Sequence, residues 1–101
     1  MIVYNVTVNI DEPVKDEWLE WMKQEHIPDV MKTGLFVEYK ILRLLQPKPD
    51  DGDTFAIQYF AKSMEDYEAY IKEHAPRLQE IHSKKYEGKF HAFRSILETA
   101  D

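Results

Sequence analysis

The sequence predicts one small α+β domain, with strands and helices in the order β-α-β-β-α-β. Two patterns support this order. Four segments alternate apolar with polar residues or are rich in β-branched and aromatic ones, and two longer segments repeat apolar residues at helical spacing. The length is a third observation, because 101 residues have room for one hydrophobic core. We therefore expect residues 1–101 to form a single domain.

The first strand is expected over residues 2–10 and the first helix over residues 14–31. Alternation in the strand places one set of apolar side chains on the same side, namely Ile2, Tyr4, Val6, Val8 and Ile10. Spacings of three and four in the helix place another set on one face, namely Leu19, Met22, His26 and Val30. Pro28 is expected to kink or end this helix, and Gly34 is a natural stop after it.

The second and third strands are expected over residues 35–45 and 54–61. Between them, residues 47–53 are dense in Pro, Asp and Gly, which are typical of turns. Two strands on either side of such a loop indicate a hairpin.

A second helical region is expected to begin after Ser63, a residue that caps helices well. Its apolar stripe consists of Met64, Tyr67, Ile71, His74, Leu78 and Ile81. Pro76 interrupts the stripe, which predicts either a kink or two consecutive helices. Gly88 ends the region, and residues 89–98 are the fourth predicted strand.

This order is the split β-α-β arrangement of ferredoxin-like domains. Right-handed crossovers then give a four-stranded antiparallel sheet with both helical regions on one face. Large apolar side chains occur on both sides of the predicted strands. Those expected on the open face are Tyr4, Val6, Val8, Phe55, Ile57, Tyr59, Phe93 and Leu97. Because large exposed apolar patches usually mark interfaces, we expect a homodimer formed through the open sheet face.

Charge and composition exclude several classes of function. The formal charge of −6 disfavours nucleic acids and anionic membranes, which need clustered Lys and Arg. Without cysteine there is no disulfide or thiolate chemistry, and the four histidines lack the close spacing of metal ligands. The N-terminal residues do not resemble a signal peptide, and we expect a cytoplasmic protein with no metal and no membrane segment.

Residues 17–34 form the most informative stretch, in which a helix with Trp18 and Trp21 leads to Glu-His-Ile-Pro at 25–28 and then to Gly34. This pattern resembles the first helix of the dimeric α+β barrel superfamily. Residues 4–10 and 92–98 are similar to a bacterial family of unknown function within it. The superfamily includes monooxygenases, haem-degrading enzymes, lactone isomerases and dehydratases, so the resemblance implies the fold and the dimer rather than one reaction.

The resemblance also implies a cleft between the sheet and the helices of each subunit. Its candidate ligand-binding side chains are Asn5, Thr7, Trp21, Gln58, His82 and Arg94, and its candidate catalytic residue is His26. Imidazole titrates near neutral pH, so His26 can act as a general acid or base. The alternative is a buried structural histidine. Asn5 and Gln58 indicate either a polar pocket or solvent-facing strand positions.

A haem-degrading branch of the superfamily uses an Asn on the first strand and a His on the second helix. Asn5 and His82 occupy broadly similar positions in this sequence. That branch also carries a Trp where this chain offers Tyr67 or Tyr70, and Pro76 intervenes. We therefore expect no cofactor and regard haem chemistry as a minor alternative.

Two classes of function stay open. One is the binding or transformation of a small apolar or aromatic molecule in the cleft. The other is a noncatalytic dimeric module that regulates a partner or interacts with it. A cavity into which Asn5, His26 and Gln58 point favours the first class. A cleft filled by aromatic side chains, namely Trp18, Trp21 and Tyr67, favours the second.

Overall fold

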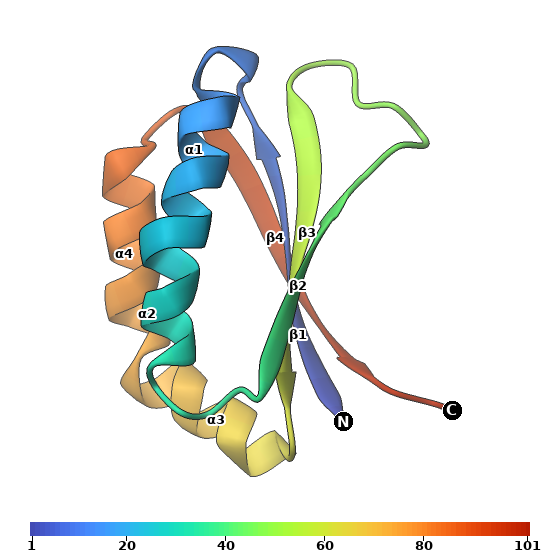
Figure 1. The fold of residues 1–101 in the computed structure, drawn as a ribbon, viewed down its shortest axis with the longest axis vertical. Helices are drawn as coiled ribbons and strands as arrows, with labels where there is room; N and C mark the ends of the chain where they lie inside the picture. Colours follow the sequence, from blue (N-terminus) through green and yellow to red (C-terminus); the bar gives the residue numbers. More distant parts are fainter.

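The computed structural model describes all of residues 1–101 and has the predicted ferredoxin-like topology. Its four-stranded antiparallel sheet has the order β2-β3-β1-β4. The strands are β1 (Ile2–Ile10), β2 (Glu38–Arg43), β3 (Asp53–Ala61) and β4 (Phe90–Glu98). Figure 1 shows all the helices on one face of this sheet and nothing on the other. β2 is shorter than the strand predicted over residues 35–45, since it begins at Glu38 and ends at Arg43.

The first helical region is continuous but changes its winding at the centre. A 3-10 turn, η1 (Glu12–Val14), leads into α1 (Lys15–Trp21), then the π-helical turn η2 (Met22–His26) and α2 (Ile27–Met31). In the π turn the N–H of Ile27 bonds to the C=O of Met22, five residues earlier. Pro28 follows in the first turn of α2, directly after the wider π turn, where its ring and its missing N–H do not break the helix. The helix consequently continues past Pro28 to Met31.

The second helical region consists of two helices, α3 (Met64–Glu73) and α4 (Ala75–Lys85). Ser63 caps α3 by accepting a hydrogen bond from the N–H of Asp66 at 3.2 Å. The helix is interrupted at His74, which lies between α3 and α4. Pro76 lies in the first turn of α4. Of the two alternatives for Pro76, the structure has two consecutive helices. Two members of the predicted stripe, Met64 and Ile81, are exposed rather than buried.

Strand register decides which side chains meet the helices. The buried side chains of β1 and β3, including Tyr4, Ile57 and Tyr59, belong to the core beneath the helices. Their expected place on the open face is therefore wrong. That face instead carries Phe93 and Leu97 of β4 and Leu42 of β2, whose exposed fractions are 65%, 47% and 46%. Apolar surface does lie on the open face, but near the sheet edges.

The β2–β3 hairpin packs its loop against the end of β1. Asn9 of β1 donates through Nδ2 to the C=O of Asp51 at 3.0 Å and to Oγ1 of Thr54 at 3.0 Å. Asp53 opens β3 and pairs with Lys15 of α1 at 3.0 Å and Arg43 of β2 at 2.9 Å. These contacts fix the hairpin relative to the rest of the sheet. None of the helices combines the length and apolarity needed to cross a membrane.

Replacing Gly52 with Ala should destabilise the fold far more than replacing Gly34 with Ala. Both glycines have positive φ, +65° and +77°, which costs an L residue about 1–2 kcal/mol. A Cβ at Gly52 would also lie 2.3 Å from the backbone oxygen of Ile10, whereas Gly34 has open space. Urea unfolding of both variants measures the difference. Equal losses of unfolding free energy would contradict the tight hairpin contact.

Candidate functional site

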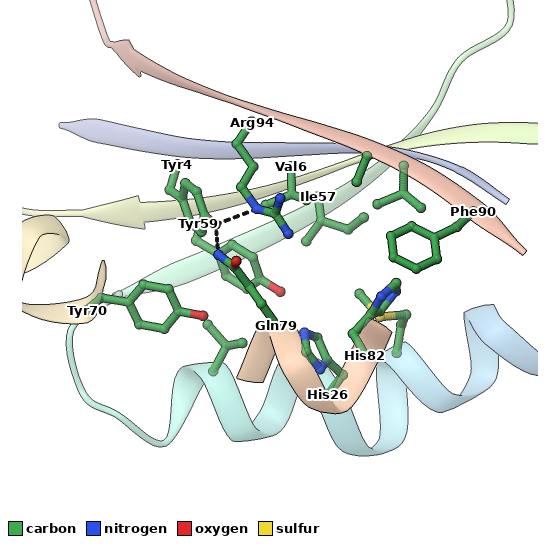
Figure 2. A pocket seen from close by; sticks show the side chains of 14 residues that line it. Tyr4, Val6, His26, Ile57, Tyr59, Tyr70, Gln79, His82, Phe90 and Arg94 are labelled. Atoms are coloured by element: carbon green, nitrogen blue, oxygen red, sulfur yellow. Dashed lines mark hydrogen bonds between the residues drawn. The ribbon is translucent and has the colours of Figure 1, made fainter. Parts of the chain in front are cut away.

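A small cavity lies between the helix-facing side of the sheet and the helices. Its volume is about 40 Å³, which is room for about three water molecules. Ten of its 14 lining residues are hydrophobic, and side chains of the sheet and of the helices converge on it, as Figure 2 shows. The lining consists of Tyr4, Val6, Val8, Met22, His26, Val30, Ile57, Tyr59, Tyr70, Gln79, His82, Phe90, Ala92 and Arg94.

His26 reaches this cavity from the last position of the π turn. Its ring packs against Trp21 with centroids 5.1 Å apart and against His82 at 5.6 Å. A π turn adds a residue to the helical repeat and thereby changes which side chains face the sheet. In this helix both ends of the turn, Met22 and His26, line the cavity. π turns of this kind are frequent at functional sites.

His82 enters from α4 and is held by a buried hydrogen bond. Nε1–H of Trp18 donates to its Nε2 at 2.9 Å, and Trp18 itself is fully buried. The ring of Phe90 packs edge-on at 4.5 Å. Because an indole can only donate, Nε2 of His82 must be the accepting nitrogen. In the neutral imidazole the proton therefore lies on Nδ1.

Both histidines are neutral at physiological pH. Burial lowers the pKa of His26 to about 4; Asp29 opposes this shift, and the positive charge of Arg94 adds to it. Burial also lowers the pKa of His82 to about 4, assisted by His26 and Arg94. An imidazole with so low a pKa is a weak base at neutral pH. It is better suited to forming hydrogen bonds than to acting as a general acid.

Arg94 is the one charged side chain in the lining at neutral pH. It extends from the edge strand β4 toward the helices, as seen in Figure 2. Its Nε donates to the hydroxyl oxygen of Tyr4 at 3.1 Å, and Nε2 of Gln79 approaches the same oxygen at 3.5 Å. Arg94, Tyr4 and Gln79 thus form a polar cluster within a mainly hydrophobic lining.

The structure brings together only some of the predicted site residues. His26, His82 and Arg94 line the cavity, and Trp21 packs behind the two histidines. Three others, Asn5, Thr7 and Gln58, are not among the lining residues. Each occupies a strand position between residues that face the helices, so its side chain lies on the opposite face of the sheet.

Asn5 is buried within a row of polar side chains across the open face. Its Nδ2 donates to Thr7 Oγ1 at 2.9 Å and to Ser95 Oγ at 3.3 Å, while Gln58 donates to its Oδ1 at 3.3 Å. We call these four residues the polar row. Because Asn5 and His82 lie on opposite sides of the sheet, they cannot contact one ligand as the haem-degrading arrangement requires.

Several residues that line the cavity were not predicted as site residues from the sequence. Tyr4, Tyr59 and Tyr70 contribute hydroxyl groups to the lining, and Gln79 contributes an amide. Tyr4 and Tyr59 looked like ordinary members of apolar strand faces, and Tyr70 was considered only as the counterpart of the Trp in the haem-degrading branch. Gln79 follows Leu78 on the polar side of a helical stripe, and nothing in the sequence marks it. No group of three or more acidic or histidine side chains could hold a metal ion.

Lowering the pH from 6.5 to 4 should reduce the free energy of unfolding by about 1–3 kcal/mol for each cavity histidine. The folded pKa is depressed, so the unfolded chain binds more protons in this window, and the stability present above pH 6.5 is lost toward pH 4. Urea unfolding across this range measures the slope. His26→Phe should reduce it, because this variant lacks one of the two buried imidazoles. A flat profile would contradict the buried neutral pair.

Comparison with known proteins agrees with the topology. The family model of a domain of unknown function, DUF4286, matches residues 1–100. No match was found among curated proteins. An EthD (ethyl tert-butyl ether) family protein from Bacillus halodurans C-125 has a TM-score of 0.73 at 16% identity, covering 99% of this chain and 100% of its own.

Two further solved structures are similar over nearly the whole chain. A dimeric ferredoxin-like protein from an uncultured marine organism has a TM-score of 0.71 at 11% identity, covering 99% and 97% of the two chains. A Streptomyces coelicolor monooxygenase in complex with nanaomycin D has a TM-score of 0.61 at 16% identity, covering 99% and 89%. Identities this low show the fold alone. Since the family model spans nearly all residues, the chain belongs to the DUF4286 family, with a ferredoxin-like α+β fold.

Proposed function

We propose that this protein binds a small, largely apolar or aromatic molecule in the cavity between its sheet and helices. The observation that supports this proposal is the lining itself, in which a few polar groups converge within an apolar wall. Ligand sites typically combine apolar surface with a few placed polar groups in this way. A cavity serving only as packing space would have no need of His26 and Arg94.

The polar atoms around the cavity supply a second argument. No fully buried side-chain nitrogen or oxygen lacks a hydrogen-bond partner. His26 forms no hydrogen bond within the protein, and neither do the hydroxyl groups of Tyr59 and Tyr70, so these atoms must touch accessible space. Buried polar groups need partners, and here a ligand or water has to supply them.

Cavity size limits what can enter without rearrangement. About 40 Å³ accommodates a small functional group but not a whole aromatic molecule. Met22 and Gln79 are unbranched, flexible side chains in the lining, and their movement would enlarge the space. The monooxygenase bound to nanaomycin D is an example of a protein with this fold holding an organic ligand.

The expectations that separated the two classes of function are met only in part. His26 lines the cavity, but Asn5 and Gln58 do not, and Trp18 and Trp21 fill the space behind the histidines. The cavity that these side chains leave open favours the binding of a ligand over a purely structural role for the lining residues. A noncatalytic module is the alternative, and a ligand-free protein with an unresponsive cavity would favour it.

We also propose that two copies pack through the open sheet face. Phe93 and Leu97 are large, apolar and exposed there, whereas the polar row in the centre satisfies its own hydrogen bonds. Solved neighbours with this fold are described as dimeric. A second copy would cover the exposed apolar side chains without leaving the polar row unpartnered.

Narrowing the cavity with Ala92→Leu should weaken binding of naphthalene-2-carboxamide, a flat neutral aromatic probe, by about tenfold, because the added methyl groups occupy ligand space. His26→Ala should also reduce the affinity, while Gln24→Ala, exposed on the same π turn, should leave it unchanged. Ligand-observed NMR titration measures all three. Equal affinities in every variant would place the probe elsewhere, and an unfolded His26→Ala protein would mark the histidine as structural.

Phe93→Glu should convert a dimer at micromolar concentration into monomers, since a carboxylate would have to be buried at the interface. Leu45→Glu provides the matched control, because Leu45 is 74% exposed in the loop between β2 and β3. Native mass spectrometry of the purified protein reads the assembly state and any retained small molecule together. A wild-type monomer would contradict the proposed interface.

A further inference from the structure

The cavity carries one positive charge and no negative charge. None of its lining residues is Asp or Glu, and Arg94 is its only permanently charged member. The four ion pairs of the protein all involve other residues, so no carboxylate lies within 4 Å of the Arg94 guanidinium. Arg94 therefore brings a positive charge without a carboxylate partner to a mainly hydrophobic site.

Hydrogen-bond donors gather beside this charge. A guanidinium has five N–H groups, and within the protein Arg94 uses only Nε–H, which donates to Tyr4. The oxygen of Tyr4 accepts from Arg94 and Gln79, while its own O–H donates to no protein acceptor. The remaining guanidinium N–H groups and the Tyr4 hydroxyl are free to donate to a ligand.

Other polar groups of the lining can donate as well. Burial raises the pKa of the Tyr59 and Tyr70 hydroxyl groups, which keeps both protonated. Figure 2 shows the Tyr70 side chain pointing along the cavity toward Gln79. His82 has its Nε2 occupied by Trp18, which leaves an N–H on Nδ1. The lining thus offers several donors and no carboxylate acceptor.

We propose that the ligand of this cavity is an aromatic acid whose oxyanion, a carboxylate or phenolate, binds the Arg94 guanidinium and the Tyr4 hydroxyl. This inference rests on the proposed function and specifies the class of its ligand. A cationic ligand would meet Arg94 without any counter-charge, and a neutral one would leave the guanidinium unpaired. An oxyanion instead forms charge-assisted hydrogen bonds, which are about twice as strong as neutral ones.

Cavity size agrees with this assignment. Room for about three water molecules suits the charged head of an aromatic acid. The aromatic body would then occupy the space that movement of Met22 and Gln79 opens. Arg94 belongs to an edge strand and is exposed in the single chain, so an incoming anion can reach it before entering the cavity.

Two matched pairs of probes test the inference on the protein as purified. Naphthalene-2-carboxylate is compared with its neutral amide, and 4-nitrophenolate with neutral 4-nitroanisole, by calorimetric titration. We expect the anion of at least one pair to bind about tenfold or more tightly than its neutral partner. Arg94→Gln should remove this preference, whereas Arg77→Gln, the same charge change at an exposed site on α4, should retain it. Thermal unfolding of both variants verifies that they are folded.

The outcomes separate this inference from the function on which it rests. Anion preference lost only in Arg94→Gln supports it, and the pair that shows the preference identifies a carboxylate or a phenolate. Equal binding of anion and neutral probe, with Ala92→Leu still weakening both, would overturn the anion assignment but leave the proposed function standing. No binding of any probe to the cavity would overturn both.

Discussion

β1 hydrogen-bonds to β3 and β4 along its whole length, and its register determines both faces of the sheet. Tyr4 and Val6 are directed to the helices, while Asn5 and Thr7 are directed to the open face. A slip of one residue would exchange these two sets. The composition of the cavity and that of the open face are therefore two consequences of one pairing, and neither can change without the other.

The helical layer acts on the site through a second buried contact. The hydrogen bond from Trp18 to His82 joins α1 to α4 and fixes the tautomer of the imidazole. The π turn brings His26 beside it, within the same apolar surroundings. Burial keeps both rings neutral, so Arg94 is left as the only charge in the cavity. Packing of the helices thus keeps both histidines uncharged and leaves the cavity with a net positive charge.

The shared fold does not identify the function of this protein, whereas the residues that line its cavity limit which ligands it can bind. The neighbours share the topology at 16% identity or less, and proteins with one fold carry out unrelated reactions. The functional conclusion rests instead on the lining of this chain, which combines hydrogen-bond donors, one guanidinium without a carboxylate partner and two neutral imidazoles. Weakly basic histidines favour recognition of a ligand over proton transfer, and the free donors favour an acceptor as that ligand.

The sequence by itself determined the order of the elements, the capping residue Ser63 and an interruption near Pro76, because these depend on local propensity and spacing. It also indicated His26, His82 and Arg94. Only the tertiary structure decided that Asn5 and Gln58 lie away from the cavity and that Tyr4 lies within it. Alternation along a strand divides side chains into two sets but does not say which set meets the helices. That choice is made by packing between segments far apart in the chain, which local patterns do not encode.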